Sequence, residues 1–567
     1  MQSWRGAQRA VYSTVKVPVP NSKNAGVSVV SRRNLIKSAA ALAVGVLLVR
    51  VEFGLADETA SIRSASVTEN NIDFIVRGVG PFQLLAFPLH ADSTRADQGV
   101  NVWEGPLHGD TKIAVARLAG PVDRMFHKFQ LFQHATGKAI GSQKYVDDLH
   151  SLNFTPPSLV WPASIKGASC PVDVKDLVEL GVKHTHINLN AAAMIHLDES
   201  QRDDAFSRVV DGRRIWLNPD TIRALDRTTR ELTDAGINAV GVVTNHGQTP
   251  GVLTHPMTDL KHAPNKMGAF NLTNDEGVLH FRALFEFITD RYCRGDRRYG
   301  SVGGWIVGNE VQSHWEWHNM GPATLAEVAR QYADELRLAW LAVRNAKANV
   351  PVFASFDHFW AMPMSKNSTR HLAGRALIDA LANLMAREGN FPWHVAQHPY
   401  PENLFQPKFW NDKTATFAYD SPRITFKNVE VLADYLRRKE MLCDGKPRRL
   451  IFSEQGLHAG DTPESELIQA AAYALAYRRI SMTPGVEAFI LHRQVDAARE
   501  GGLKLGIWPL TGTGVGKRKR PIWEVVKSAD TPQWDSASRF ALGIIGISDW
   551  SMAKPQAGPF PATGKHL

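Results

Sequence analysis

The N-terminal part of the chain alternates apolar and polar residues over short runs. Residues 71–77, 82–87, 112–117 and 129–132 show this alternation, and turn residues separate the runs. A period of two is typical of strands that bury one face, and no long helical pattern intervenes. We therefore expect a small all-β, sandwich-like domain over residues 57–155.

From residue 156 the pattern changes to short apolar runs that alternate with longer amphipathic segments. The runs predict eight strands, at residues 158–162, 184–189, 238–244, 302–307, 352–356, 393–397, 450–453 and 486–491. The segments that follow predict eight helices, at residues 172–181, 219–236, 276–292, 324–348, 373–387, 429–442, 465–480 and 522–528. A hairpin around Asp211-Gly212 is expected at residues 207–217, after the second strand.

Eight strand–helix units in succession predict an α/β fold, a (β/α)8 TIM barrel over residues 156–530, with residues 531–567 as a C-terminal tail. The alternative is a doubly wound open sheet. That fold usually carries a glycine-rich phosphate turn after an early strand, and none is present here. The segment 512–517 resembles a P-loop, but Thr511 and Arg518 occupy positions that the motif reserves for Gly and Ser/Thr.

The positive charge of the chain is concentrated at its N-terminus. Residues 1–56 hold eight Lys or Arg and one acidic residue, which accounts for +7 of the net +9. Because the remainder is nearly neutral, the charge does not indicate a nucleic-acid partner. The four basic residues at 517–520, which adjoin the P-loop-like segment, most often belong to a solvated loop. Binding of a uronate or sulfated sugar by these residues is the alternative.

Residues 1–56 resemble a twin-arginine (Tat) signal segment. Arg32 and Arg33 precede the apolar run 39–49, and small residues follow at 54–56. The run is shorter than the roughly 20 residues that span a bilayer. We expect export to the periplasm or the medium, with no stable membrane span after signal cleavage; an uncleaved signal anchor is the alternative.

The three cysteines, Cys170, Cys293 and Cys443, are far apart in the sequence. An odd, sparse set without CxxC spacing indicates neither a disulfide framework nor a structural zinc site. We expect them to be buried small side chains, and we expect no cofactor and no metal.

Two carboxylates carry the chemical information in this chain. Glu310 follows the strand predicted at 302–307, and Glu454 follows the strand predicted at 450–453. A parallel barrel places its chemistry at the C-terminal ends of its strands. Two carboxylates that converge there can cleave a glycosidic bond, one as acid and the other as nucleophile or base.

Asn309-Glu310 on the fourth strand and Glu454-Gln455-Gly456 on the seventh resemble the motifs of clan A glycoside hydrolases. The segment Ile306–Met320 also resembles an uncharacterised family of exported bacterial proteins of unknown function. The first resemblance implies a retaining mechanism, with Glu310 as acid/base, Glu454 as nucleophile and Asn309 on the sugar 2-hydroxyl. The chain departs from the clan where an Arg on the second strand and a Trp on the eighth are usual.

Further residues at the same barrel mouth are candidates for substrate binding. The clan resemblance implies a Tyr or His near the sixth strand beside the nucleophile, and His398 and Tyr400 stand there. Apolar sugar faces stack on aromatic rings, so Trp317 and Trp360 are candidate platforms. Asn245 and His246, after the third strand, and Asp357 and His358, after the fifth, offer hydrogen bonds to hydroxyls. For His398, Tyr400, Trp317 and Trp360, packing inside the protein is the alternative interpretation.

The sequence predicts an exported retaining glycoside hydrolase whose partner is a poly- or oligosaccharide. One alternative is a metal-dependent hydrolase on the same barrel, with ligands from His184, His186, His358, His398 and Asp496. His184 and His186 fall at the start of their predicted strand, away from the catalytic end, which disfavours it. The other alternative is a carbohydrate-binding protein without activity.

Overall fold

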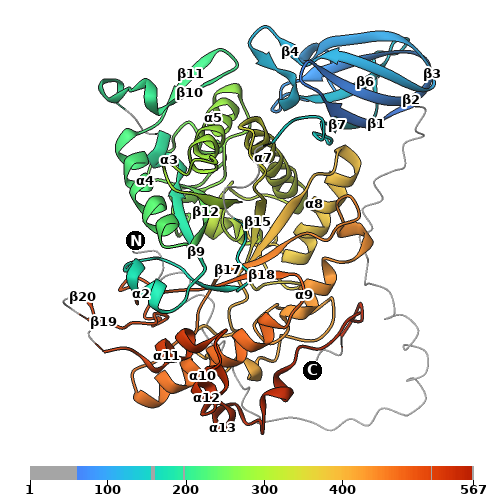
Figure 1. The fold of residues 1–567 in the computed structure, drawn as a ribbon. Helices are drawn as coiled ribbons and strands as arrows, with labels where there is room; N and C mark the ends of the chain where they lie inside the picture. Colours follow the sequence, from blue (N-terminus) through green and yellow to red (C-terminus); the bar gives the residue numbers. More distant parts are fainter. Residues whose placement is uncertain (1–59, 155–159, 196–197, 512–513, 517, 565–567) are drawn as a thin grey trace, which may run out of the picture.

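The computed structural model describes residues 60–154, 160–195, 198–511, 514–516 and 518–564. The predicted signal segment 1–56 lies outside the described residues. An all-β region precedes a barrel of alternating strands and helices, as predicted (Figure 1). Within the described ranges, no helix has both the length and the apolar character needed to cross a membrane.

The N-terminal region is a five-stranded antiparallel sheet. Its strands are β1 (Ala60–Val67), β2 (Asn71–Phe87), β3 (Val100–Ala116), β6 (Lys128–Gln133) and β7 (Lys138–Tyr145). The runs predicted at 71–77 and 82–87 form the single long strand β2, which pairs with β1, β3 and β6. The glycines that suggested a turn lie inside β2, where Gly80 has a φ of +106°. A short hairpin joins β3 to β6, formed by β4 (Leu118–Ala119) and β5 (Val122–Asp123).

This sheet packs on the barrel through named contacts. The hydroxyl of Tyr145 donates to Asp334 at 2.9 Å, and the Arg337 guanidinium lies 4.3 Å from the Tyr145 ring centre. Arg282 lies 3.5 Å from the ring centre of Phe126. Around these contacts, apolar side chains of the sheet and of the barrel belong to one continuous hydrophobic core.

Eight parallel strands form a closed barrel. They are β8 (Lys166–Ala168), β9 (His184–Asn190), β12 (Asn238–His246), β14 (Val302–Val307), β15 (Val352–Phe356), β16 (Trp393–Gln397), β17 (Leu450–Gln455) and β18 (Val486–Leu491). Pairing of β9 with both β8 and β12 closes the ring. The first strand was predicted wrongly at 158–162, since residues 160–162 form no strand and β8 begins at Lys166.

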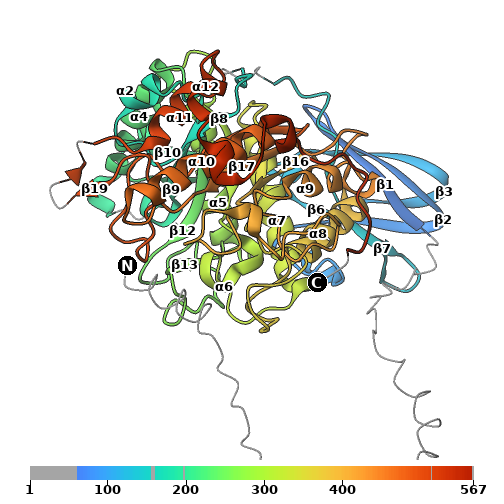
Figure 2. The ribbon, with the colours of Figure 1, turned by 90° about the horizontal axis from the view of Figure 1, so that it is seen from below.

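Helices cover the outside of the barrel. Those that follow the barrel strands are α2 (Val174–Glu179), α4 (Pro219–Asp234), α5 (Asp275–Tyr292), α7 (Leu325–Asn345), α8 (Gly374–Glu388), α9 (Val429–Tyr435), α10 (Pro463–Ser481) and α11 (Pro521–Ser528). Figure 2 views this arrangement from below. The shorter elements are α3 (Ala191–Ile195), β10 (Ser207–Val210), β11 (Arg213–Trp216), β13 (Met267–Gly268), α6 (His314–Trp317), β19 (Leu510–Thr511), β20 (Gly514–Val515), α12 (Trp534–Ser538) and α13 (Ala541–Ile545).

The C-terminal segment folds against the barrel. Within it, α12 and α13 lie beside α11 and α10 (Figure 1). Arg478 of α10 lies 5.2 Å from the ring centre of Trp534 and 4.5 Å from that of Trp550. The predicted tail therefore packs on α10 through helices and tryptophans of its described part, residues 531–564.

Side chains from alternate positions of the strands fill the barrel interior. A separate hydrophobic cluster there includes Val240, Ile306, Phe353 and Ile451. Trp161 packs beneath it at the N-terminal end of the strands, with its ring centre 6.3 Å from Phe353 and 5.3 Å from His184. Trp161, in the described part of the segment predicted as the first strand, therefore closes the bottom of the barrel.

Replacing Trp161 by Ala is expected to lower the free energy of unfolding by about 2–3 kcal/mol, because it removes a half-buried ring from the closed end. The matched control is Val160→Ala, whose side chain is 87% exposed and whose effect should stay within about 0.5 kcal/mol. Urea unfolding measures both. Equal losses for the two variants would contradict the closing role of Trp161.

Candidate active site

A β-bulge on β17 turns Glu454 toward the barrel mouth. Phe452 pairs with Phe489, whereas Gln455 pairs with Leu491, so β17 has one residue more than β18 over this interval. Ile451 faces the interior, and strict alternation would send a residue three positions later outward. The extra residue turns the side chain of Glu454 to the interior instead, because a bulge changes the direction of the side chains at its site. Ser453 and Glu454 therefore both face the interior.

Glu310 is set by a tight turn after β14. Gly308 has a φ of +71° and Glu310 a φ of +43°, so the chain enters the left-handed region twice within three residues. A non-glycine residue in this region costs free energy and is frequent at functional sites. The N–H of Glu310 donates to Ser355 Oγ at 3.0 Å, which anchors the turn to β15. The side chain is buried, with the residue only 8% exposed.

The segment after β16 contacts both carboxylates. His398 Nδ1 lies 2.8 Å from Glu310 Oε1, and its Nε2 lies 3.0 Å from Ser453 Oγ. Two residues later, the hydroxyl of Tyr400 donates to Glu454 Oε1 at 3.0 Å. One short segment thereby links the candidate acid on β14 to the candidate nucleophile on β17.

Both carboxylates line one cavity of about 370 Å³ at the C-terminal ends of the strands. Its apolar walls include Trp317, Phe359 and Leu505. Its other lining residues are Asn188, Val242, Thr244, Asn265, Met267, Asn309, Glu316, Asp357, His358, Met364, Tyr400, Leu404, His492, Glu500 and Leu503. A concave, largely apolar site with a few converging polar groups is typical of a small-molecule pocket.

The protein shifts the two carboxyl groups in opposite directions. Burial raises the pKa of Glu310, and the negative charges of Glu454 and Glu316 raise it further against the opposing contact with His398. Burial alone would also raise the pKa of Glu454. The positive charges of His492, His398 and His186, with the Tyr400 hydrogen bond, outweigh it and lower that pKa to about 2. One group is thus suited to hold a proton and the other to stay ionised.

Asp357 lies at the end of β15 and holds the loop that follows Glu310. Burial and the charge of Glu310 raise the pKa of Asp357 well above its usual value. Its oxygens accept from the Ser313 hydroxyl at 2.5 Å and from the Phe359 N–H at 2.6 Å. These bonds fix the loop after Glu310 against the end of β15, so the contacts of Asp357 in the structure are within the protein.

The structure brings together most, but not all, of the predicted site. Asn309, Tyr400 and Trp317 line the cavity beside the two Glu residues. Trp360 does not, because it is only 1% exposed, packs on Tyr435 and donates from Nε1 to the carbonyl of Tyr419. Its ring face is therefore closed to a sugar, and its prediction as a platform is wrong.

Asn245 and His246 are also outside the cavity lining. Asn245 is buried, and its Nδ2 donates to the carbonyl of Leu253 at 2.9 Å, which shapes the loop after β12. The backbone N–H of His246 donates to Asn190 Oδ1 at 3.1 Å. The side chain of Asn245 therefore acts within the protein at the end of β12, whereas the side chain of His246 is exposed outside the cavity lining.

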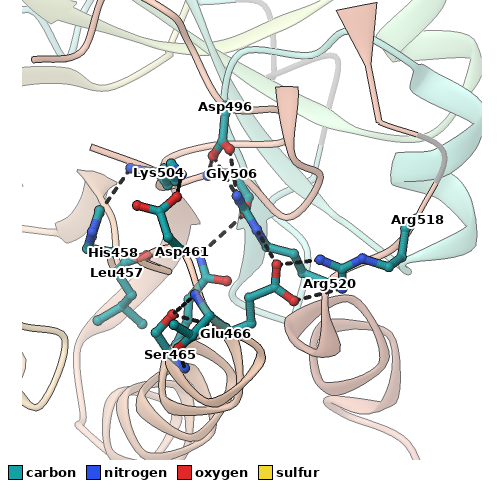
Figure 3. Close-up of polar contacts among 12 residues, drawn as sticks. Leu457, His458, Asp461, Ser465, Glu466, Asp496, Lys504, Gly506, Arg518 and Arg520 are labelled. Atoms are coloured by element: carbon teal, nitrogen blue, oxygen red, sulfur yellow. Dashed lines mark hydrogen bonds and ion pairs between the residues drawn. The ribbon is translucent and has the colours of Figure 1, made fainter. Parts of the chain in front are cut away.

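The ligand set of the alternative metal hydrolase does not assemble. His184 lies at the closed end of the barrel, 3.0 Å from the carbonyl of Ser164, while His398 contacts Glu310 at the open end. Asp496 is held by Arg520 through contacts of 2.9 and 2.6 Å (Figure 3). Its carboxylate is thus neutralised by an arginine.

Figure 3 also shows the basic residues that follow β20. Arg518 makes a two-pronged ion pair with Glu466, at 2.7 and 2.6 Å. Arg520 approaches the same carboxylate at 3.5 Å. These arginines fasten the loop after β18 to α10, so their charges are satisfied within the protein.

Three side chains beside Glu454 were not predicted as part of the site. Cys170 follows β8, His186 lies within β9, and His492 follows β18. His186 Nδ1 donates to the carbonyl of Ser453 at 2.7 Å, so this residue lies close to the candidate site and not at the strand start as expected. The sequence did offer a signal for this position: His186 lies two residues after His184 on the predicted strand, so both side chains face the same side of β9.

Comparison with known families gives one match. Residues 158–553 match the family described as "Family of unknown function (DUF5722)". The chain belongs to this family. The match covers the barrel and α10 to α13, and it confirms the predicted resemblance to a family of unknown function. A search of curated proteins gave no match.

Solved structures that resemble this DUF5722 member are glycoside hydrolases. One is a family 39 glycoside hydrolase from Bacteroides cellulosilyticus, with 12% identity and a TM-score of 0.42, covering 84% of this chain and 81% of that one. Another is a β-glucosidase from Pyrococcus furiosus, with 13% identity and a TM-score of 0.41, covering 66% and 87%. At these values the likeness carries no argument about activity, which has to rest on the site.

Replacing Gly308 by Ala is expected to lower the free energy of unfolding by at least about 1 kcal/mol, because a side chain is strained at this φ. The added Cβ would also lie 2.9 Å from His318 Nδ1. The control is Gly543→Ala in α13, where the added Cβ meets open space and should be neutral or slightly stabilising. Thermal and urea unfolding compare the two. An unchanged Gly308→Ala protein would contradict the strained turn.

Proposed function

We propose that this protein is an exported glycoside hydrolase that cleaves a poly- or oligosaccharide with retention, through Glu310 and Glu454. The main support for this proposal is that His398 and Tyr400 hydrogen-bond the two carboxylates at one cavity. The opposite pKa shifts of the two groups fit an acid and a nucleophile.

In the first step, Glu310 donates its proton to the oxygen that leaves the anomeric carbon. Its raised pKa keeps this proton available at higher pH than an ordinary carboxyl group would. Glu454, ionised, attacks the anomeric carbon and forms a glycosyl ester. Glu310, now deprotonated, takes a proton from water, and this water cleaves the ester and releases the sugar.

Tyr400 positions the nucleophile. Burial raises the pKa of the Tyr400 hydroxyl well above its usual value, so it remains a hydrogen-bond donor to Glu454. A donated hydrogen bond favours the ionised carboxylate and fixes one of its oxygens. The other oxygen of Glu454 is then the one that attacks.

The cavity favours a neutral sugar. Its lining includes Glu310, Glu316, Asp357, Glu454 and Glu500, and it contains neither Lys nor Arg. The positive charge of His492 in the lining is already opposed by Glu454 and Glu500, so a uronate or sulfated sugar would meet negative charge without a free cation to pair with. Trp317 offers an aromatic surface for a sugar face, and Asn309 offers an amide for a hydroxyl.

Export is supported by the N-terminal pattern alone. Arg32 and Arg33 precede a short apolar run and a small-residue stretch, in the order of a twin-arginine signal. Because such signals carry folded proteins, the barrel would reach the periplasm or the medium already assembled.

Substitution of each Glu tests the proposed activity. We expect the protein to hydrolyse members of a panel of aryl glycosides and oligosaccharides, with hexosides cleaved better than matched hexuronides. Glu454→Gln should lose activity by several orders of magnitude on every substrate. Glu310→Ala should retain activity on aryl glycosides with good leaving groups, since these need little protonation, and azide should accelerate its second step.

The exposed residue Glu464 supplies the control, and Glu464→Gln should match the parent. Circular dichroism checks that each variant is folded. Turnover that persists in folded Glu454→Gln would contradict the two-carboxylate mechanism.

The pH profile tests the opposite pKa shifts. Activity should fall on the alkaline side as Glu310 loses its proton, and at low pH only as Glu454 gains one. In Tyr400→Phe the pKa of Glu454 should rise because a donor is lost, which moves the acid limb to higher pH. The lost charge-assisted bond should lower kcat by about 10–100-fold.

The matched variant is Tyr419→Phe, which removes a hydroxyl that donates to Asp434 outside the cavity lining. Its pH profile should equal that of the parent. An acid limb that does not move in Tyr400→Phe would mean that this hydroxyl does not tune Glu454.

A further inference from the structure

Cys170, His186 and His492 form a cluster beside the two-carboxylate site. They come from β8, β9 and β18 or the turns that follow them, and these strands are neighbours in the barrel. One ligand atom from each lies within 4.8 Å of the others. His492 also lines the cavity that contains Glu454, so the cluster borders on the proposed sugar site.

The ring of His186 is oriented so that one nitrogen is left without a hydrogen bond. Its Nδ1 lies 2.7 Å from the carbonyl of Ser453, and since a carbonyl only accepts, this nitrogen carries the proton. The residue is 2% exposed, and its Nε2 faces the Cys170 thiol without a hydrogen bond of normal geometry to any described residue. A buried polar atom without a partner costs about 1–3 kcal/mol unless something binds it.

The ring of His492 is oriented in the same manner from the other side. Its Nε2 lies 3.1 Å from Glu500 Oε1, and the carboxylate also accepts from Arg493. Nε2 therefore keeps a proton, and Nδ1 is the nitrogen that a cation can bind in place of the second proton, which gives the ring its positive charge in the metal-free protein. This nitrogen lies 3.0 Å from the hydroxyl of Ser169, which also lies 3.8 Å from Cys170 Sγ. Imidazoles that ligate metals typically donate their other N–H to a carbonyl or a carboxylate.

We propose that Cys170 Sγ, His186 Nε2 and His492 Nδ1 bind one thiophilic divalent cation, Zn²⁺ by the chemistry of its ligands. A thiolate with two imidazoles is a donor set that suits zinc, and three protein ligands leave a fourth position open. Tetrahedral zinc places such atoms about 3.3–3.6 Å apart, so the side chains would close by about 1 Å around the ion. Since His492 lines the cavity, an ion bound by this residue would lie beside the proposed sugar site.

This arrangement differs from an ordinary thiol–imidazole contact. A single imidazole would be enough to bind the proton of one thiol. Here two imidazoles, each fixed by its own acceptor, converge on one sulfur atom. The proposal concerns binding alone, and it holds whether or not the protein is a glycoside hydrolase.

Cobalt binding tests the site directly. The full-length protein, reduced and stripped of metal with a chelator, is titrated anaerobically with Co²⁺. We expect one equivalent to bind, with a thiolate-to-cobalt charge-transfer band and the visible bands of a tetrahedral ion, both bleached by Zn²⁺. Cys170→Ser should lose the charge-transfer band. Glu500→Gln, which removes the negative charge of the outer acceptor of His492, should weaken binding by about 10–100-fold.

Cys443→Ser is the matched control, because Cys443 lies beside Asp444 and Arg448, outside this cluster, and its loss should leave the cobalt spectrum unchanged. No charge-transfer band in the parent, or an unchanged band in Cys170→Ser, would overturn the proposal.

A second measurement needs no variant. In the parent, Zn²⁺ should slow the modification of Cys170 by a small thiol reagent at least tenfold, while Cys443 reacts at its former rate, as read from peptide masses. Equal rates at Cys170 with and without Zn²⁺ would overturn the proposal independently of any effect of substitution on folding.

Discussion

The geometry of the site depends on two hydrogen bonds from one short segment after β16. His398 holds Glu310 at 2.8 Å and Tyr400 holds Glu454 at 3.0 Å. The two carboxylates come from strands that do not pair with each other, since β15 and β16 lie between them. Without that segment, two buried acids at one cavity would repel each other and turn away.

Local irregularities of the backbone bring the carboxylates within reach of that segment. The bulge on β17 turns Glu454 inward, and the left-handed turn at Gly308 and Glu310 does the same on β14. The ion pairs of Arg520 with Asp496 and of Arg518 with Glu466 fix the loop that carries His492 and Glu500 (Figure 3). A regular barrel thus supplies the frame, and two departures from regularity and one ion-paired loop supply the site.

Most of the barrel could be predicted because its strands are continuous apolar runs. β14, β15, β16 and β18 have the predicted bounds. β8 was missed because Lys166–Ala168 is short and contains no apolar run, whereas the preceding Trp161 segment looks like a strand but closes the barrel. The long strand β2 was divided in the prediction because its glycines look like a turn, although the pairing with β3 continues through them.

Within the site, the sequence predicted which side chains lie at the ends of the strands. It did not predict the direction in which side chains of the following loops point. Glu310, Glu454, His398 and Tyr400 converge because strand ends meet at one mouth. Trp360 fails because its loop folds back under Tyr419 and Tyr435.

The cluster of Cys170, His186 and His492 escaped prediction because its residues are far apart in sequence and meet only across β8, β9 and β18. Pairwise spacing along the chain cannot reveal a set of this kind, and it led us to expect no metal.

Trapping of the covalent intermediate tests the central claim most directly. The protein is incubated with 2-deoxy-2-fluoro glycosides of the sugars that it hydrolyses, and the modified peptide is identified by mass spectrometry. The account predicts one glycosyl unit per chain, attached to the side chain of Glu454. Turnover of the parent sugar with a label on another residue, or with inverted product and no label, would contradict it.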